Sequence, residues 1–194
     1  MSKPVLAYHF TDGYRLRDGQ PLEMGREYVF DGTPVMCARG YHASRHVFDA
    51  LEYAPGATLS LVECREVTEE RDDKLVCRRR RVIATIDATD LLRKFARLCA
   101  LDVVHLWEAP EIVILYLKTG DESLREAARI AAWDVAWDAM DAAQDAARDA
   151  AWAAAQDAVR AAAMGATRRR QRVRLDRMVN QAFNSRFDRE GMLD

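Results

Sequence analysis

Proline is missing from the second part of this 194-residue chain, because all five prolines lie at or before Pro110. Proline breaks an α-helix by removing a backbone donor, so its distribution separates a mixed first part from a part that is free to be helical. Residues 121–163 also lack glycine and are rich in alanine, the strongest helix former. The sequence therefore predicts one long helix there, about 60 Å in length if unbroken.

Other signals are missing as well. No run of about 18 apolar residues occurs, so we expect no membrane-spanning helix. The opening residues, MSKPVLAYHFTDG, hold no hydrophobic signal segment, which favours a cytoplasmic protein. The four cysteines form neither a C-x-x-C motif nor a Cys/His cluster, so we expect reduced thiols and no metal site.

Short catalytic motifs are also lacking. The sequence contains no G-x-x-x-x-G-K-[ST], H-E-x-x-H, G-x-S-x-G or G-x-G-x-x-G pattern. Nucleoside-triphosphatase and serine-hydrolase functions therefore have no supporting residues. A net charge of −2 predicts no partner by itself.

The first part alternates short apolar segments with turn signals, which is typical of strands. A helix is expected over Arg45–Tyr53, because Ser44 suits the N-cap and Pro55-Gly56 ends it. We predict an α+β fold with a small mixed or antiparallel sheet domain over residues 1–87. The expected strands are Val5–Phe10, Tyr28–Phe30, Val35–Cys37, Thr58–Cys64, Lys74–Cys77 and Val82–Asp87.

The second part, residues 88–194, is predicted to be all-helical. Helices are expected from Thr89 to about Trp107, over Glu111–Lys118, over about 121–163 and over about 168–188, where the last is rich in arginine. Gly165 is expected to break the alanine-rich helix. Because the segments on either side of this glycine carry opposite charge, they are predicted to pack as an antiparallel hairpin.

The alanine-rich segment carries a regular row of aspartates that includes Asp138, Asp141 and Asp145. At about 100° per residue these carboxylates fall on one stripe of a helix. The stripe suits the solvated face of a packing helix. It also suits a surface that binds a partner, and we keep these three aspartates as candidate partner-binding residues.

Two arginine-rich segments, Arg78–Arg81 and 168–174, could contact phosphate. A solvated strand edge explains the first, and pairing with the aspartates explains the second. No aromatic residues are interleaved with either segment to stack on bases. Nucleic acid is therefore a weakly supported partner.

Three segments of the first part belong together: AYHFT at 7–11, GYHAS at 40–44 and ALEYA at 50–54. Their residues and spacing resemble the ADP-ribosyltransferases of the diphtheria-toxin and poly-ADP-ribose polymerase type. The resemblance implies an ADP-ribosyltransferase-like sheet domain that binds NAD as cofactor.

The same resemblance implies roles for individual residues. His9 would hold the ribose hydroxyls, and Tyr41 and Tyr53 would stack on the nicotinamide ring. Such enzymes use a glutamate on a later strand, for which the candidates are Glu63, in SLVEC, and Glu111, in APEIVILY.

Most of the chain also resembles a family of bacteriophage and prophage proteins. The resemblance lies in the GYHAS, ALEYAPG and DDKLVCRRRRVIATID segments and in the tryptophan-studded alanine helix. It implies a protein that works in the cytoplasm of a bacterial host. Its partner would be a host protein or protein complex, including a component of host defence.

The motifs and the two resemblances leave two candidate functions. The first is a phage-type accessory protein that binds a host macromolecule, needs no cofactor and is not an enzyme. The alternative is an NAD-dependent mono-ADP-ribosyltransferase that modifies a host protein. The sequence favours the first, because Glu63 comes early for the catalytic position and Glu111 begins an expected helix.

Overall fold

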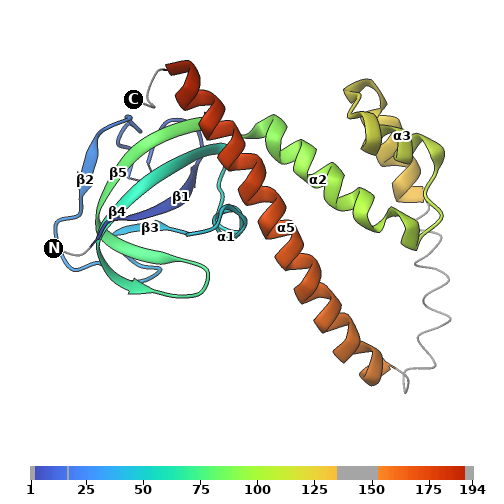
Figure 1. Ribbon diagram of the computed structural model, residues 1–194, viewed down its shortest axis with the longest axis horizontal. Helices are drawn as coiled ribbons and strands as arrows, with labels where there is room; N and C mark the ends of the chain where they lie inside the picture. Colours follow the sequence, from blue (N-terminus) through green and yellow to red (C-terminus); the bar gives the residue numbers. More distant parts are fainter. Residues whose placement is uncertain (1–2, 17, 135–152, 191–194) are drawn as a thin grey trace. The chain divides into compact units, whose positions relative to one another are not determined.

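The computed structural model describes residues 3–16, 18–134 and 153–190 (Figure 1). The chain divides into two compact units. The first contains Met1–Leu92 and Gln171–Asp194, and the second contains Arg93–Arg170. Within the described ranges, no helix combines the length and the apolar character needed to cross a membrane.

The first unit is built on a five-stranded sheet whose strand pairs are all antiparallel (Figure 1). Its order is β1-β4-β5-β2, and β3 pairs with β5 beside β2. The strands are β1 Val5–Thr11, β2 Glu27–Val29, β3 Tyr41–Ala43, β4 Thr58–Glu70 and β5 Leu75–Asp87.

The centre of the sheet is a long hairpin of β4 and β5, each 13 residues in length. The sequence predicts three short strands here, Thr58–Cys64, Lys74–Cys77 and Val82–Asp87, and this part of the prediction is wrong. The turn is confined to the residues between Glu70 and Leu75, where Arg71 N donates to Lys74 O at 2.8 Å. Charged residues fill exposed strand positions instead, because cross-strand ion pairs such as Arg79–Glu27 stabilise them there.

The sheet curls until its two edges meet. β5 pairs with β3 through one segment and with β2 through another, while β1 lies at the opposite edge. Tyr8 N donates to Ser44 O at 2.7 Å and Ser44 N donates to Tyr8 O at 3.0 Å, so β1 also bonds to the residue after β3. We call the concave side the inner face. Its buried cluster is Ala7, Leu16, Leu22, Tyr28, Ala43, Val62, Cys64, Leu75, Cys77 and Val82.

The opposite side, the outer face, packs against the last part of helix α5, Ala153–Glu190. Figure 1 shows this helix crossing the sheet. Leu175, Val179 and Phe183 recur at helical spacing and are all buried. Tyr8, which points away from the inner face, donates its hydroxyl proton to Asn180 Oδ1 at 2.6 Å. Apolar packing and polar contacts therefore both fix the end of α5 to the sheet.

A short helix, α1 Val47–Leu51, is held by the same part of α5. Asp176 Oδ1 accepts from Val47 N at 2.9 Å, and its Oδ2 lies 2.8 Å from His46 Nδ1. Arg172 Nη2 donates to Asp49 Oδ1 at 2.7 Å. Because the side chain of Asp176 bonds the first backbone donor of α1, α5 supplies the cap that the local sequence lacks.

The second unit is helical. It contains most of α2, Thr89–Val103, then η1 Val104–Leu106, α3 Glu111–Thr119, η2 Glu122–Leu124 and a helix over residues 125–134. The helix expected at Glu111–Lys118 is present as α3. Gly120 ends it in the left-handed conformation with φ of 69°, which glycine adopts without steric cost.

The predicted fold class is wrong in its second half. The described residues of the C-terminal half form short helices followed by one long helix, α5, which covers Ala153–Glu190, whereas the predicted long helix ends near 163. Gly165 lies inside α5, so no hairpin turns there. A glycine inside a helix costs only about 1 kcal/mol relative to alanine, and strong helix formers flank this one. Residues 135–152, with Asp138, Asp141 and Asp145, lie outside the described residues.

Candidate functional site

The inner face of the sheet brings together polar side chains from three strands. His9 lies on β1, Tyr41 on β3 and Arg80 on β5. The bond between Tyr8 and Ser44 is what makes this possible, because it joins the strand of His9 to the strand of Tyr41. Arg80 lies two residues before Val82 on β5, so both side chains point to the inner face, and Arg80 is only 3% exposed.

Arg80 makes few contacts for a buried cation. Its Nη1 donates to the backbone oxygen of His42 at 3.1 Å. Its Cζ lies 4.9 Å from the centroid of the Tyr41 ring, a cation–π contact. Its Nε is buried without a hydrogen-bond partner. Burial lowers the pKa of Arg80, although guanidinium remains charged at any physiological pH.

Aromatic rings and thiols surround this guanidinium. The ring of Tyr28 meets that of Tyr41 edge to face, with centroids 6.2 Å apart. Burial raises the pKa of the Tyr41 hydroxyl. The Cys77 thiol donates to Tyr41 O at 3.4 Å, and a hydrogen bond with Cys77 together with burial raises the pKa of Cys64. Both thiols are reduced.

His9 is neutral in this setting. Burial lowers its pKa well below the ordinary value, and the charge of Arg80 and the nearby His42 lower it further. A neutral imidazole keeps one N–H donor and one acceptor nitrogen. The inner face therefore carries both a cation and a neutral histidine, and the charge of the first acts on the second.

We expect His9 to make the protein sensitive to mild acid. The pKa of His9 is lower in the folded protein than in the unfolded chain, so the unfolded chain binds the proton first. Its contribution to the unfolding free energy is complete above about pH 6.5 and is lost as the pH falls through the folded pKa. His9→Gln should flatten this dependence in urea unfolding curves recorded between about pH 7 and pH 5.

The matched control is His105→Gln, because His105 is exposed in the second unit. This variant should keep the acid sensitivity of the original protein. An unchanged pH dependence in His9→Gln would show that this half-buried histidine is not its source.

The two tyrosines of the expected nicotinamide site do not share an environment. Tyr41 packs on Arg80 at the inner face, whereas Tyr53 follows α1 and is 52% exposed. The Tyr53 hydroxyl bonds to Asp73, and Lys74 Nζ lies 4.4 Å from its ring centroid. Among the contacts of the described residues, no ring contact joins the two tyrosines.

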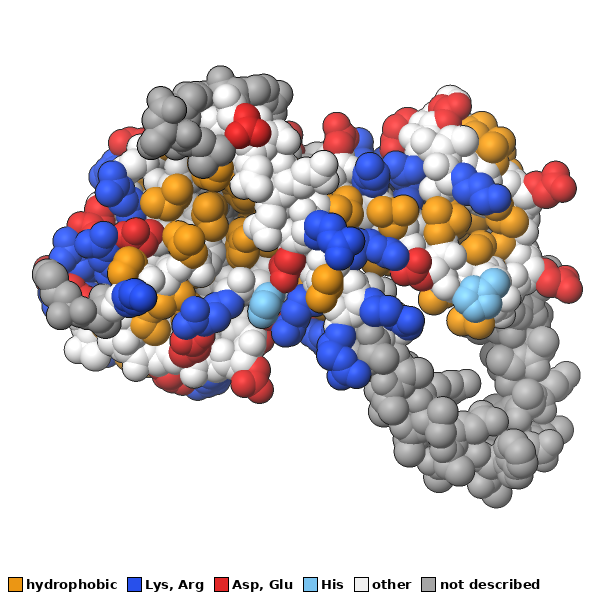
Figure 2. Space-filling model, viewed as in Figure 1, with side chains coloured by type: hydrophobic (Ala, Val, Ile, Leu, Met, Phe, Trp, Pro, Cys, Tyr) orange, Lys and Arg blue, Asp and Glu red, His pale blue; other side chains and the backbone are white. Residues whose placement is uncertain are grey.

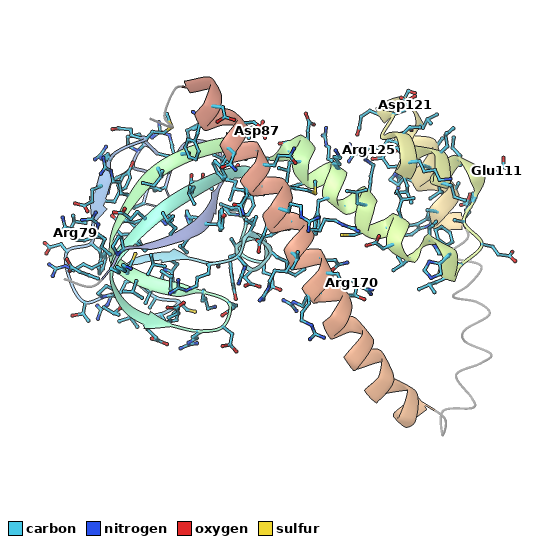
Figure 3. All side chains as sticks on the ribbon, in the orientation of Figure 1. Arg79, Asp87, Glu111, Asp121, Arg125 and Arg170 are labelled. Carbon is cyan, nitrogen blue, oxygen red and sulfur yellow. The ribbon has the colours of Figure 1, made fainter. Side chains whose placement is uncertain are left out.

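Of the two candidate glutamates, one lies on the outer face of the sheet and the other belongs to the second unit. Glu63 alternates with Val62 and Cys64, so it points to the outer face, where its Oε1 is 2.6 Å from Arg65 Nε. Glu111 is in the second unit, at the first turn of α3 (Figure 3). The described part of the chain holds no group of three or more His, Cys, Asp or Glu side chains placed to bind a metal ion.

Comparison with known proteins gives a domain boundary. A family described as "Domain of unknown function (DUF7666)" matches residues 5–94, from the start of β1 into α2 and less than half of the chain. No curated protein and no solved structure matches the chain. The matched segment includes His9, Tyr41 and Arg80, while the helical second unit falls almost entirely outside it.

Proposed function

We propose that the protein acts by binding a macromolecule of a bacterial host, namely a protein, and that the second unit provides the contact surface. The observation that carries this proposal is the exposure of large apolar side chains there. Leu106 is 72% exposed, and Trp133 is 63% exposed. Leu115, Ile130 and Trp107 are also exposed on the same unit.

The described helices of this unit bury few apolar side chains. Their buried apolar residues are Phe95, Val113 and Ala128. Figure 2 shows hydrophobic side chains at the surface over the α2 and α3 region. Aromatic and aliphatic side chains grouped in this way are characteristic of protein-binding surfaces, since their burial against a partner drives association.

Charge favours a protein over nucleic acid. The arginines beside this surface are paired with neighbouring glutamates, Arg125 with Glu122 at 3.4 Å and Arg129 with Glu126 at 2.6 Å. Arginines that are paired with a carboxylate three residues earlier contribute little to the phosphate contacts on which nucleic-acid binding depends. The resemblance to bacteriophage proteins supports a bacterial host as the source of the partner, including its defence systems.

The transferase alternative has less support from the geometry. Stabilising a cationic sugar intermediate needs a carboxylate close to the bound ribose, and Glu63 points away from the face that holds His9. The conclusion is therefore a binding protein without catalytic activity.

Replacing Trp133 should weaken the partner contact strongly. Truncating a tryptophan that is buried in an interface typically weakens the binding free energy by about 2 kcal/mol or more, which is at least a tenfold loss of affinity. The protein would first be used to capture partners from a bacterial lysate, and mass spectrometry would identify them. The affinity of each captured protein would then be measured for the original chain and for Trp133→Ala. Leu106→Ser is a second variant on the same unit.

The matched control is Tyr14→Ala, since Tyr14 is equally exposed, at 64%, but lies on the first unit. It should bind as the original protein does. If Trp133→Ala and Leu106→Ser bind normally and Tyr14→Ala does not, the contact lies on the first unit. Light scattering distinguishes a further outcome, in which the surface is covered by a second copy of the chain.

A further inference from the structure

The charge of Arg80 is not balanced within the part of the chain that the structure describes. Taking a guanidinium out of water is unfavourable unless an anion or several hydrogen bonds replace the water. Arg80 is 3% exposed, yet within the described residues its hydrogen bonding is limited to a single carbonyl oxygen, that of His42. The cation–π contact with the Tyr41 ring offsets part of the lost hydration free energy, but the ring supplies no negative charge.

The neighbouring acids are engaged elsewhere. Glu27 and Glu66 pair with Arg79, at 2.5 Å and 3.6 Å, on the opposite side of β5 from Arg80. The sulfurs of Cys64 and Cys77 also act on Arg80. A hydrogen bond with Cys64 lowers the pKa of Cys77. The Cys77 thiol nevertheless donates to Tyr41 O at 3.4 Å, and this bond requires the protonated, uncharged form.

The unpaired edge of Arg80 has a definite chemistry. Nη1 is used by the His42 carbonyl, and Tyr41 covers one flat side of the guanidinium. Nε has no partner among the described residues, and together with Nη2 it forms the edge that donates two parallel hydrogen bonds to two oxygens of one anion. Carboxylates and phosphates present oxygens at this spacing.

We propose that Arg80 anchors a binding site for a small oxyanion, of the phosphate class, on the inner face of the sheet, with His9 as the second binding residue. The anion accepts from Nε and Nη2 of Arg80. His9 lies in the field of Arg80 and carries an N–H that can donate to a third oxygen. This site belongs to the first unit and is independent of the apolar surface on the second.

Protonation of His9 couples the site to pH. In the empty site the charge of Arg80 disfavours the imidazolium form. A bound anion offsets that charge and favours protonation, so affinity for the anion should rise as the pH falls below neutrality. Among the described residues, Asp18 raises the pKa of Tyr41, but the groups that act on Arg80 itself are two thiols and two tyrosine hydroxyls. Glu63 points outward, and Glu27 and Glu66 pair with Arg79.

The test uses the full chain with its arginine side chains labelled with nitrogen-15. The Nε–H signal of Arg80, assigned by its loss in Arg80→Lys, is followed during titration with inorganic phosphate, glycerol 3-phosphate and acetate. A saturable shift with phosphate or the ester, larger at lower pH, supports the site. A stronger response to the ester than to free phosphate identifies a phosphate monoester as the preferred form, and an equal response to acetate identifies a general carboxylate or phosphate site.

Thermal stability provides a second readout, because a ligand that binds only the folded state raises the melting temperature. Phosphate should stabilise the original protein and the control Arg81→Lys, whose exposed arginine lies next in sequence. It should have at least a tenfold weaker effect on Arg80→Lys, which keeps the charge and loses the two-bond edge, and on His9→Gln.

Three results would overturn the proposal. The first is an Nε–H signal that does not move with any of the three anions. The second is equal loss of phosphate binding in Arg81→Lys and Arg80→Lys, which would mean general attraction to a basic strand. The third is an Nε–H signal that ignores phosphate and shifts in Cys77→Ser, which would make a Cys77 thiolate the internal counter-ion. If Arg80→Lys does not fold, the stabilisation by phosphate of the original protein and of Arg81→Lys, set against its loss in His9→Gln, decides the question.

Discussion

Leu175→Ala should lower the unfolding free energy of the first unit by about 2–5 kcal/mol. Leu175 is fully buried, and it lies on the stripe of α5 that also buries Val179 and Phe183. The substitution removes apolar contacts and leaves a cavity that the curled sheet cannot close by small shifts. Because α5 covers the outer face, the loss should appear in the cooperative unfolding of the sheet.

Urea unfolding followed by tyrosine fluorescence or circular dichroism gives the measurement. Val173→Ala is the matched control, since Val173 is on the same helix but 57% exposed, and it should change the unfolding free energy by less than about 0.5 kcal/mol. Equal effects of the two substitutions would mean that this end of α5 is not part of the folded core.

Arg172→Ala should cost about 2–3 kcal/mol, the second largest effect that we expect. Asp49, whose Oδ1 accepts from Arg172 at 2.7 Å, is 2% exposed, and its Oδ2 has no partner among the described residues. Removing the arginine leaves a buried carboxylate without its cation, which is far less favourable than removing both groups. The side chain of Arg172 is itself 34% exposed, so the full cost of a sealed ion pair does not apply.

A double-mutant cycle separates the pair from its surroundings. Asp49→Ala and Arg172→Ala together should destabilise less than the sum of the two single variants. Arg177→Ala, at an exposed position of α5, is the control and should be close to neutral. Additive effects in the cycle would show that Asp49 and Arg172 do not stabilise each other.

Local signals predicted the elements that depend on local chemistry. The strand at Val5–Phe10 follows from alternation, and α3 follows from Pro110 and Gly120. β5 was predicted as two pieces, because four consecutive arginines conceal the alternation of a strand. Gly165 was predicted to break the helix, but a single glycine is compatible with either outcome, and α5 continues through it.

The candidate site was only partly accessible from the sequence. His9 and Tyr41 were singled out by their resemblance to known motifs, and the structure places both on the inner face. Tyr53 lies elsewhere, because motif spacing carries no information about the curl of the sheet. Arg80 was interpreted as part of a solvated edge. Its position two residues before Val82 was the available signal, since alternation sends both side chains to one face, but only the closure between Tyr8 and Ser44 shows that this face is enclosed.

The sheet and the helix that covers its outer face lie far apart in the sequence, and this has a consequence for synthesis on the ribosome. The last strand ends at Asp87, whereas Leu175 and Phe183 are translated roughly a hundred residues later, which takes several seconds at typical rates of about 5–20 residues per second. During that interval the outer face, with Phe10 and Leu59, is not covered, because α5 has not yet been synthesised. A nascent or prematurely stopped chain would therefore present an apolar sheet surface to chaperones and proteases, so the level of functional protein in the cell depends on translation reaching its last segment.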